Sequence, residues 1–469
     1  MLASVSLSSD TKAFLIRTKA VKNVLLLALH NDVQVRRDAV FCVANLSDSP
    51  ELQVDIISEG SIDILHKVGN CHDMVTLRDI SRAFSSLSTT NAGKESIIKN
   101  GVLGLILTLA RSIDILTQRH AALSICNVSC SGNKAAIVDS TYLRTLIFLL
   151  RFPDLNIERY ILLTVAALCL GGSDNCKLKM IKEGFMQHLL EKVKFPDIEI
   201  NCCAALAINS VVMGEYQKIK EEVATCAGLP SILSLAESND KECAYIAVYL
   251  LGNLAENDEV KAKLVGLNTI SIIVRTSYSA SIQLKRASAY FLALLASGVD
   301  YHNNLAYNSG LEAVIHLAMQ ADLECQEFSA FSLAYIASNR EYQVKLVQMG
   351  AIRPLVAMMA ADDESKHYAG LALLKLADNY ENHLTIAEEG GIQALLKMGR
   401  NQVTDEELQY KAALTVGNLA SNAVNLMPTE IKTKDGIGFA TSSLQRRKIK
   451  NKKVPKIISD SLDKLNEEK

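Results

Sequence analysis

The stretch AVYLLGNLA at residues 247–255 decides the fold, because variants of it recur along the chain. The earliest clear copy is AVFCVANLS at residues 39–47. One place in the stretch, Asn253 in the first example and Asn45 in the second, is called the asparagine position. Its ten occurrences lie 40 to 44 residues apart, at Asn45, Ser86, Asn127, Cys169, Asn209, Asn253, Leu294, Tyr335, Lys375 and Asn418. A period of this length indicates a repeat protein.

Each repeat is predicted to contain three helices. A glycine recurs in phase with the asparagine position, at Gly60, Gly101, Gly184, Gly228, Gly310, Gly350 and Gly390. Glycine accepts the left-handed backbone conformation that ends one helix and redirects the chain into the next. The longer third helix then has one apolar face, formed in the sixth repeat by Ala247, Leu250, Leu251 and Leu254. Since one such helix cannot bury this face alone, neighbouring repeats must stack.

This three-helix repeat, with its glycine turn and its third helix ending in Asn-Leu-Ala, resembles the armadillo family. The resemblance covers residues 10–425. It implies an all-α, right-handed superhelical solenoid of about ten repeats. HEAT repeats are the alternative, but they usually have two helices per repeat and lack the asparagine position. Residues 426–469 are expected to form a basic, flexible tail.

The composition argues against several classes of protein. The formal net charge is −2, which is not the overall positive charge typical of nucleic-acid binders. The eleven cysteines are an odd number without a Cys-x-x-Cys pair, which indicates reduced thiols. Apolar stretches such as residues 160–170 are too short to span a bilayer. We therefore expect a cytoplasmic protein, with the nucleus as a further compartment, that binds no nucleic acid.

No arrangement of residues in the sequence indicates catalysis. Gly93 and Lys94 lack the other residues of a phosphate-binding loop. His66, Cys71 and His72 match no zinc-binding spacing. We therefore predict that the protein is not an enzyme and has no small-molecule substrate, no cofactor and no metal.

The asparagine positions are expected to line a groove. At 100° per residue, this position lies away from the apolar face of the third helix, so stacked repeats would align it as a ladder. An asparagine amide offers two hydrogen-bond donors and one acceptor for a peptide main chain. The resemblance implies this peptide-binding role for Asn45, Asn127, Asn209, Asn253 and Asn418.

Side chains four and eight residues before the asparagine position extend the predicted groove. Its first part is basic, with Arg37, Arg78, Arg82 and Arg119, and Arg286 follows later. Its later part is aromatic, with Tyr245, Tyr249, Tyr290 and Phe331 at these places and Tyr335 at the asparagine position itself. Arginine and aromatic residues are common anchors of protein interfaces. In the alternative interpretation, the arginines support packing between helices and the tyrosines fill half-buried corners.

These features predict an adaptor or scaffold that binds an extended segment of another protein, with acidic and apolar residues, in its concave groove. One alternative is a structural or membrane-associated organiser that uses the convex face and the ends. Others are a targeting subunit of a ubiquitin ligase and a nuclear-import adaptor. The import adaptors of the family hold lysine between tryptophans, and this chain has no tryptophan.

The predicted tail carries a cluster of basic residues, at Arg446, Arg447, Lys448, Lys450, Lys452 and Lys453. Such a cluster is typical of a nuclear localisation signal, of a patch that binds anionic lipids, or of a solvated tail.

Overall fold

The structure is a computed structural model that describes residues 20–130, 139–170, 174–213, 217–225, 228–360, 365–400 and 412–417, together with residues 18 and 419. Every regular element assigned in these ranges is a helix, which confirms the predicted all-α class. The chain divides into two compact units, Met1–Leu235 and Ala236–Lys469. No helix of the described ranges is both long and apolar enough to cross a membrane.

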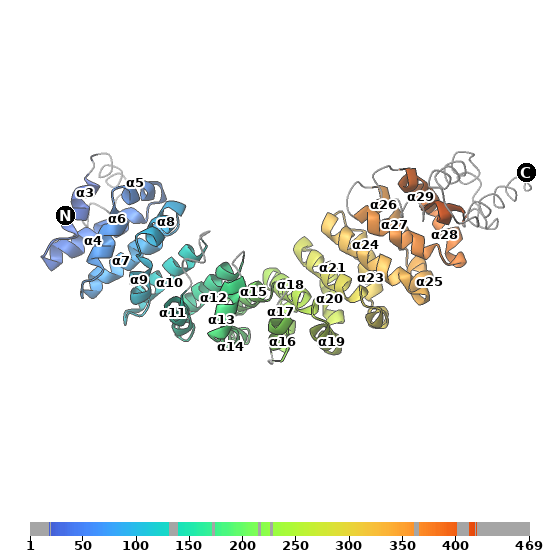
Figure 1. Cartoon of the computed structure of the whole chain (residues 1–469), viewed down its shortest axis with the longest axis horizontal. Helices are drawn as coiled ribbons and strands as arrows, with labels where there is room; N and C mark the ends of the chain where they lie inside the picture. Colours follow the sequence, from blue (N-terminus) through green and yellow to red (C-terminus); the bar gives the residue numbers. More distant parts are fainter. Residues whose placement is uncertain are drawn as a thin grey trace, which may run out of the picture. The chain divides into compact units, whose positions relative to one another are not determined.

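Unit 1 is a series of helices packed in chain order (Figure 1). They are α3 (Val21–Leu27), α4 (Val33–Ser47), η1 (Pro50–Leu52), α5 (Gln53–Ser58), α6 (Ser61–Val68), α7 (Met74–Leu87), α8 (Asn91–Lys99), α9 (Leu103–Leu109), α10 (Ile115–Ser129), α11 (Ser140–Leu150), α12 (Leu155–Cys169), α13 (Asp174–Lys182), α14 (Phe185–Lys192), α15 (Ile198–Val212) and α16 (Gln217–Thr225), and α17 (Leu229–Ala236) ends at the boundary. The long third helices of this unit are α4, α7, α10, α12 and α15, and each packs against the next one.

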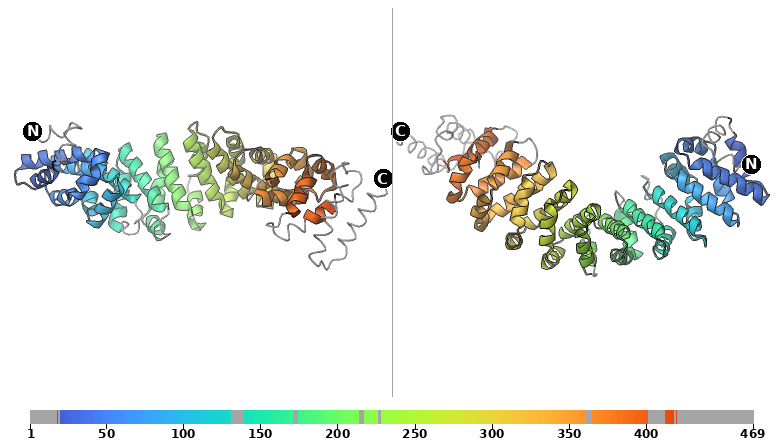
Figure 2. Two further views of the ribbon diagram at one scale, coloured as in Figure 1. Left: turned by 90° about the horizontal axis from the view of Figure 1, so that it is seen from above. Right: turned by 180° about the vertical axis from the view of Figure 1, so that it is seen from behind.

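Unit 2 repeats the arrangement, which is visible from two further sides in Figure 2. Its helices are α18 (Lys241–Ala255), α19 (Asp258–Gly266), α20 (Thr269–Ser277), α21 (Ile282–Ala296), η3 (Val299–Tyr301), α22 (His302–Tyr307), α23 (Gly310–Ala318), α24 (Leu323–Ser338), α25 (Arg340–Gln348), α26 (Ile352–Ala360), α27 (Ser365–Leu376), η4 (Tyr380–Asn382), α28 (His383–Glu388) and α29 (Gly391–Arg400). The third helices α18, α21, α24 and α27 pack side by side in this order.

The core consists of the apolar faces of the third helices, as the sequence predicts. In α18 the four predicted residues Ala247, Leu250, Leu251 and Leu254 are fully buried. The equivalent residues of α4 and α27 are buried to the same extent, at Ala39, Cys42, Val43, Leu46, Ala369, Ala372, Leu373 and Leu376. Small residues at the first place of this pattern let neighbouring helices approach closely.

Most third helices begin at an aspartate that the repeat pattern did not include. The carboxylate accepts backbone N–H groups of the first helical turn, which satisfies donors that have no partner within the helix. These caps are Asp32, Asp73, Asp114, Asp154, Asp197, Asp240 and Asp322, and Ser281 replaces the aspartate in α21.

The caps correct the predicted register of two repeats. Asn127 lies thirteen residues after its cap, Asp114, and Asn45 and Asn253 lie at the same distance from theirs. Thirteen residues after the caps of α12 and α15, Asp154 and Asp197, lie Ala167 and Ser210. The assignments of Cys169 and Asn209 to the asparagine position are therefore wrong, and both residues are buried. Apolar residues fill this part of both helices, so the pattern was aligned two residues late in α12 and one residue early in α15.

The left-handed turns before the second helices are largely as predicted. The backbone angle φ is positive at Gly60, Gly101, Gly184, Gly350 and Gly390. The prediction for Gly310 is wrong, because Ser309 takes the left-handed conformation there with φ of 59°. Gly310 instead lies close to Leu305, whose Cδ2 atom would be 2.8 Å from an added Cβ. Glycine is thus needed at this place for close packing.

Gly101 and Gly104 offer a matched test of the turn, because an added Cβ would meet no atom within 4 Å at either place. Gly101 has φ of 67°, whereas Gly104 lies within α9. We expect Gly101→Ala to lower the free energy of unfolding by about 1–2 kcal/mol, because alanine is strained in the left-handed region. Gly104→Ala is expected to raise it by about 0.5–1 kcal/mol, because alanine favours the helix. Urea denaturation followed by circular dichroism would measure both, and equal effects of the two variants would contradict the assigned turn.

Candidate functional site

Two asparagines of the predicted ladder, Asn45 and Asn127, make hydrogen bonds between neighbouring helices. Asn45 is only 6% exposed, and its Oδ1 atom accepts a hydrogen bond from Arg82 Nη2 at 2.9 Å. Asn127 donates to the backbone oxygen of Ser85 at 3.3 Å and to Ser88 Oγ at 3.1 Å. Asn253 is 5% exposed, and Asn418 lies outside the described residues. The structure therefore places Asn45, Asn127 and Asn253 closer to the core than predicted, and the binding of a peptide main chain by the predicted asparagines stays a prediction.

The arginines of the predicted basic part of the groove form ion pairs between consecutive third helices. Arg78 on α7 contacts the capping carboxylate of α10, with Nε at 2.9 Å and Nη2 at 2.7 Å from the two oxygens of Asp114. The same pairing, at 2.6 to 2.7 Å for the closest atoms, joins Arg37 to Asp73, Arg119 to Asp154 and Arg286 to Asp322. Each aspartate thus caps its own helix and binds the preceding one.

These ion pairs compensate the positive charge of the arginines. The side-chain hydrogen bond from Arg78 is the main cause that lowers the pKa of Asp114 to about 2. Arg37 lowers the pKa of Asp73 and Arg286 lowers the pKa of Asp322 in the same way. The structure therefore gives these arginines the packing role of the alternative interpretation. Their binding of an acidic partner stays a prediction.

Arg82 belongs to a separate polar network on α4 and α7. Its guanidinium contacts Asp48 at 2.8 Å and Asp79 at 3.5 Å, in addition to Asn45. It also lies 5.2 Å from the centre of the Phe41 ring. Ser86 Oγ donates to the same Asp48 at 2.6 Å. Arg82 is therefore held by four side chains of its own unit.

The aromatic residues predicted for the later part of the groove lie near one another on the third helices of unit 2. The rings of Tyr245 and Tyr249 on α18 stack at 6.0 Å, and Tyr249 lies 6.2 Å from Tyr290 on α21. On α24, Phe331 and Tyr335 lie 4.5 Å apart. The structure thus joins three of the predicted residues across α18 and α21 and places the other two in contact on α24.

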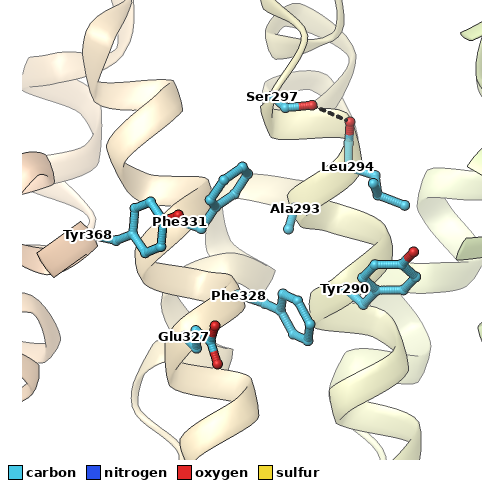
Figure 3. A pocket seen from close by; sticks show the side chains of 8 residues that line it. All are labelled: Tyr290, Ala293, Leu294, Ser297, Glu327, Phe328, Phe331 and Tyr368. Carbon is cyan, nitrogen blue, oxygen red and sulfur yellow. Dashed lines mark hydrogen bonds between the residues drawn. The ribbon is translucent and has the colours of Figure 1, made fainter. Parts of the chain in front are cut away.

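A cavity of about 230 Å³ opens within this aromatic surface. Its lining comes from α21, α24 and α27 and from the residue after α21, and consists of Tyr290, Ala293, Leu294, Ser297, Glu327, Phe328, Phe331 and Tyr368 (Figure 3). Two ring pairs form its walls, Tyr290 with Phe328 at 5.4 Å and Phe331 with Tyr368 at 5.2 Å. Ala293 lies between the two pairs. This cavity is called the aromatic pocket.

Among the lining residues that sequence reasoning missed are two aromatic rings, Phe328 and Tyr368, and one carboxylate, Glu327. Phe328 and Tyr368 lie seven residues before Tyr335 and Lys375, so they occupy the same place in successive repeats. Only the places four and eight residues before the asparagine position were followed, although residues seven places before it also line the aromatic pocket. Glu327 lies eight residues before Tyr335, at a place where several other repeats have arginine.

Tyr290 is held in position from two sides. Its hydroxyl donates a hydrogen bond to Glu256 Oε1. Burial, together with this contact, raises the pKa of Tyr290, so the phenol stays neutral. A Cβ added at Gly252 would lie 2.7 Å from Tyr290 Cδ1, so glycine on α18 leaves the room that this ring occupies. The wall of the aromatic pocket is therefore preorganised.

The double role of the capping aspartates can be measured at Asp114. Asp114→Ala removes both the cap and the ion pair, and we expect it to lower the free energy of unfolding by about 1–2 kcal/mol. Arg78→Ala leaves the cap in place and is expected to cost no more than about 1 kcal/mol. Glu95→Ala, at an exposed place on α8, is the control. Thermal denaturation ranks the stabilities of the three variants. A larger loss of stability for Arg78→Ala than for Asp114→Ala would show that capping is not the main role of Asp114.

The lowered pKa of Asp114 predicts a defined pH dependence. The carboxylate stabilises the folded state above its ordinary pKa of 3.8, and this contribution is lost as the pH falls toward about 2. Asp114→Asn keeps a capping side chain but cannot ionise. We expect the difference in urea midpoint between the parent and this variant to be largest above pH 5 and to shrink between about pH 4 and pH 2. A difference that stays constant over this range would exclude the ionised pair as its cause.

Comparison with known proteins informs the fold. No protein-family model matches the chain, and no curated protein matches it. Among solved structures, the chain is similar to an engineered protein whose crystal structure comes from the Northeast Structural Genomics Consortium. The match has a TM-score of 0.78 and 23% sequence identity, and it covers 86% of this chain and 99% of the engineered one. At this identity the likeness shows the fold alone, and the chain therefore has an all-α, repeat-like solenoid fold.

Proposed function

We propose that the protein is a non-catalytic interaction scaffold of the armadillo type, which binds an extended segment of another protein on the third helices of unit 2. The single observation that carries this proposal is the aromatic pocket, an open cavity between two pairs of rings. The armadillo assignment is supported by the three-helix repeat and by the asparagines near the ends of the third helices.

Several properties of the aromatic pocket suit a protein ligand. Its rings are half-buried, so they are held by the fold and still present surface to a partner. Aromatic side chains supply large contact areas and lose little conformational entropy when they bind. The row that runs from Tyr245 to Tyr290 extends the surface beyond the pocket itself. A segment in extended conformation would contact both the pocket and this row.

A second candidate is a structural organiser that binds through another surface. Exposed apolar residues occupy the first place of several third helices, directly after the cap. They include Val33, Met74, Leu155 and Ile198 in unit 1 and Ile282 and Leu323 in unit 2. Repeated apolar exposure at equivalent places indicates a contact surface. This set lies at the starts of the helices and shares no residue with the aromatic pocket.

The proposed function can be tested by selecting peptides from a displayed library of random 15-residue sequences against the full chain. The double variant Phe331→Ala, Tyr368→Ala removes one wall of the aromatic pocket. We expect the selected peptides to bind it at least about tenfold more weakly, because central aromatic residues dominate interface energies. Tyr307→Ala, which removes a tyrosine that is 91% exposed and does not line the pocket, is the control.

Fluorescence anisotropy with labelled peptides gives the affinities, and circular dichroism checks that each variant is folded. Selected peptides that bind the double variant as tightly as the parent would place the binding surface elsewhere. Loss of binding by Tyr307→Ala alone would point to the face that carries this residue.

A further inference from the structure

Two neighbouring turns of unit 1 carry the same short pattern where a third helix begins. Residues 111–116 read Arg-Ser-Ile-Asp-Ile-Leu at the start of α10, and residues 151–155 read Arg-Phe-Pro-Asp-Leu at the start of α12. Each has an arginine three residues before the capping aspartate. Because Arg119, near the start of α10, binds the cap of α12, the two helices start side by side. These two segments are called the edge turns.

The apolar side chains of the edge turns protrude from the unit. Ile113 is 90% exposed, and Leu155 is 50% exposed. Leu116 and Phe148, the latter in the last turn of α11, are also exposed. The core covers little of Ile113, so most of its apolar surface is open to a contact outside the unit. Several large apolar side chains exposed together indicate a contact surface.

The same edge of the two preceding repeats is apolar as well. The starts of α4 and α7 join the row of helix starts, because Arg37 binds the cap of α7 and Arg78 binds the cap of α10. The exposed apolar residues beside the caps of α4 and α7 are Leu29, Val33, Met74 and Val75. Four consecutive repeats thus expose large apolar side chains along one edge of unit 1.

The arginines of the edge turns keep their positive charge uncompensated. Arg111 Nη2 donates a hydrogen bond to Thr145 Oγ1 at 2.9 Å. Arg151 Nη2 donates to His188 Nε2 at 3.1 Å, and an imidazole that accepts at one nitrogen is neutral. Within the described part of the chain, neither arginine pairs with a carboxylate. Each guanidinium is therefore held in place by a neutral partner.

The carboxylates of the edge turns are already neutralised. Asp114 is bound by Arg78 and Asp154 by Arg119. The edge turns therefore carry a surplus of positive charge from Arg111 and Arg151.

The positive charge is centred on these two turns. In the next repeat Lys194 has the place of the edge arginines, but the exposed Glu191 and the cap Asp197 lie three residues to either side of it. The starts of α10 and α12 are thus the part of the edge where apolar exposure and positive charge coincide.

An anionic membrane surface fits both features of the edge turns. Basic side chains are attracted to negatively charged headgroups, and apolar side chains enter the boundary between headgroups and acyl chains. A partner helix is usually received in a groove. The apolar side chains of the edge turns protrude instead, and fluid lipid adapts its shape to such side chains. The shape of the edge therefore favours lipid over a protein helix.

We propose that unit 1 binds the surface of an anionic lipid bilayer through the edge turns. Arg111 and Arg151 contact the headgroups, and Ile113, Leu116 and Leu155 enter the boundary below them. This inference rests on the second candidate function, because it names what the exposed apolar edge contacts, and it does not depend on the aromatic pocket. Since few side chains enter the lipid, the association is weak and reversible.

The depth of an introduced indole tests the contact, because the full chain contains no tryptophan. Ile113→Trp places the reporter in an edge turn. Tyr307→Trp, at a residue of unit 2 that is 91% exposed, is the control reporter. The probes are vesicles of phosphatidylcholine alone and of equal parts phosphatidylcholine and phosphatidylserine. Both are also prepared with phosphatidylcholine brominated in its acyl chains, which quenches an indole that reaches them.

We expect brominated anionic vesicles to quench the fluorescence of Ile113→Trp, vesicles of phosphatidylcholine alone to quench it much less, and neither to quench Tyr307→Trp. Absence of quenching of Ile113→Trp by anionic vesicles, or equal quenching of the two reporters, would overturn the inference.

Two charge variants in the Ile113→Trp chain test the arginines. Arg111→Gln with Arg151→Gln is expected to raise the anionic lipid concentration needed for half-maximal quenching at least about tenfold, because each basic residue adds attraction only near the surface. Lys99→Gln with Lys182→Gln removes the same charge at exposed lysines that end α8 and α13, and is the matched control. Circular dichroism checks the fold of each variant. An equal effect of the two pairs would show that only net charge matters and would contradict the edge turns as the site.

A variant without tryptophan excludes the indole itself as the cause of binding. Ile113→Ser with Leu155→Ser is expected to reduce co-sedimentation of the otherwise unchanged chain with anionic vesicles. Leu267→Ser with Val299→Ser, at two exposed apolar residues of unit 2, is the control and should sediment like the parent. Sedimentation of the edge variant that equals that of the parent would refute insertion of these side chains.

A soluble peptide separates this inference from the second candidate function. The probe repeats Leu-Glu-Glu-Leu-Leu-Glu-Glu and offers an acidic amphipathic helix. If it shifts the emission of Ile113→Trp while vesicles do not, the contact surface stands and the lipid is wrong. If neither the peptide nor the vesicles change this emission, both the lipid and the contact surface at the edge turns are wrong.

Discussion

The burial of one apolar face per repeat is the constraint on which the rest of this structure depends. A third helix such as α18 presents Ala247, Leu250, Leu251 and Leu254 on one side, and only neighbouring helices can remove these side chains from water. This requirement fixes which side of each third helix faces inward. The opposite side then has a constant geometry from repeat to repeat, so equivalent residues of successive repeats become neighbours. Differences in side chain at equivalent places, and not differences in backbone, create the local chemistry of each surface.

The fold could be predicted because the burial constraint leaves a strong periodic signal. The period, the apolar face of the third helices and most glycine turns follow from it directly. The register of α12 and α15 could not be read from the asparagine position, since Cys169 and Asn209 lie in continuous apolar runs that fit more than one alignment. The capping aspartates, Asp154 and Asp197, carry the missing information. Helix starts therefore fix the register better than the more variable helix ends.

The candidate site was predictable only in part, because its residues depend on contacts between repeats. The place of Arg37, Arg78 and Arg119 was identified as facing outward, but the aspartates that bind them lie 35 or 36 residues further along the chain. A single repeat shows an unpaired arginine, and the pair appears only after stacking. The aromatic pocket has the same origin, since α21, α24 and α27 each supply part of its lining. Such a site is a property of neighbouring repeats and has no continuous motif.

The ion pair between an arginine and the next capping aspartate has a consequence for how such a chain can grow. Each complete repeat of this kind carries an aspartate that pairs with the arginine of the preceding repeat and an arginine that pairs with the aspartate of the following repeat. In the repeat of α7 these residues are the cap Asp73 and Arg78. A duplicated copy inserted in tandem would bring both connecting groups with it, and its two new junctions would match the old ones. Gene duplication can therefore lengthen this array without inventing an interface, and divergence at single outward places can then supply new specificity.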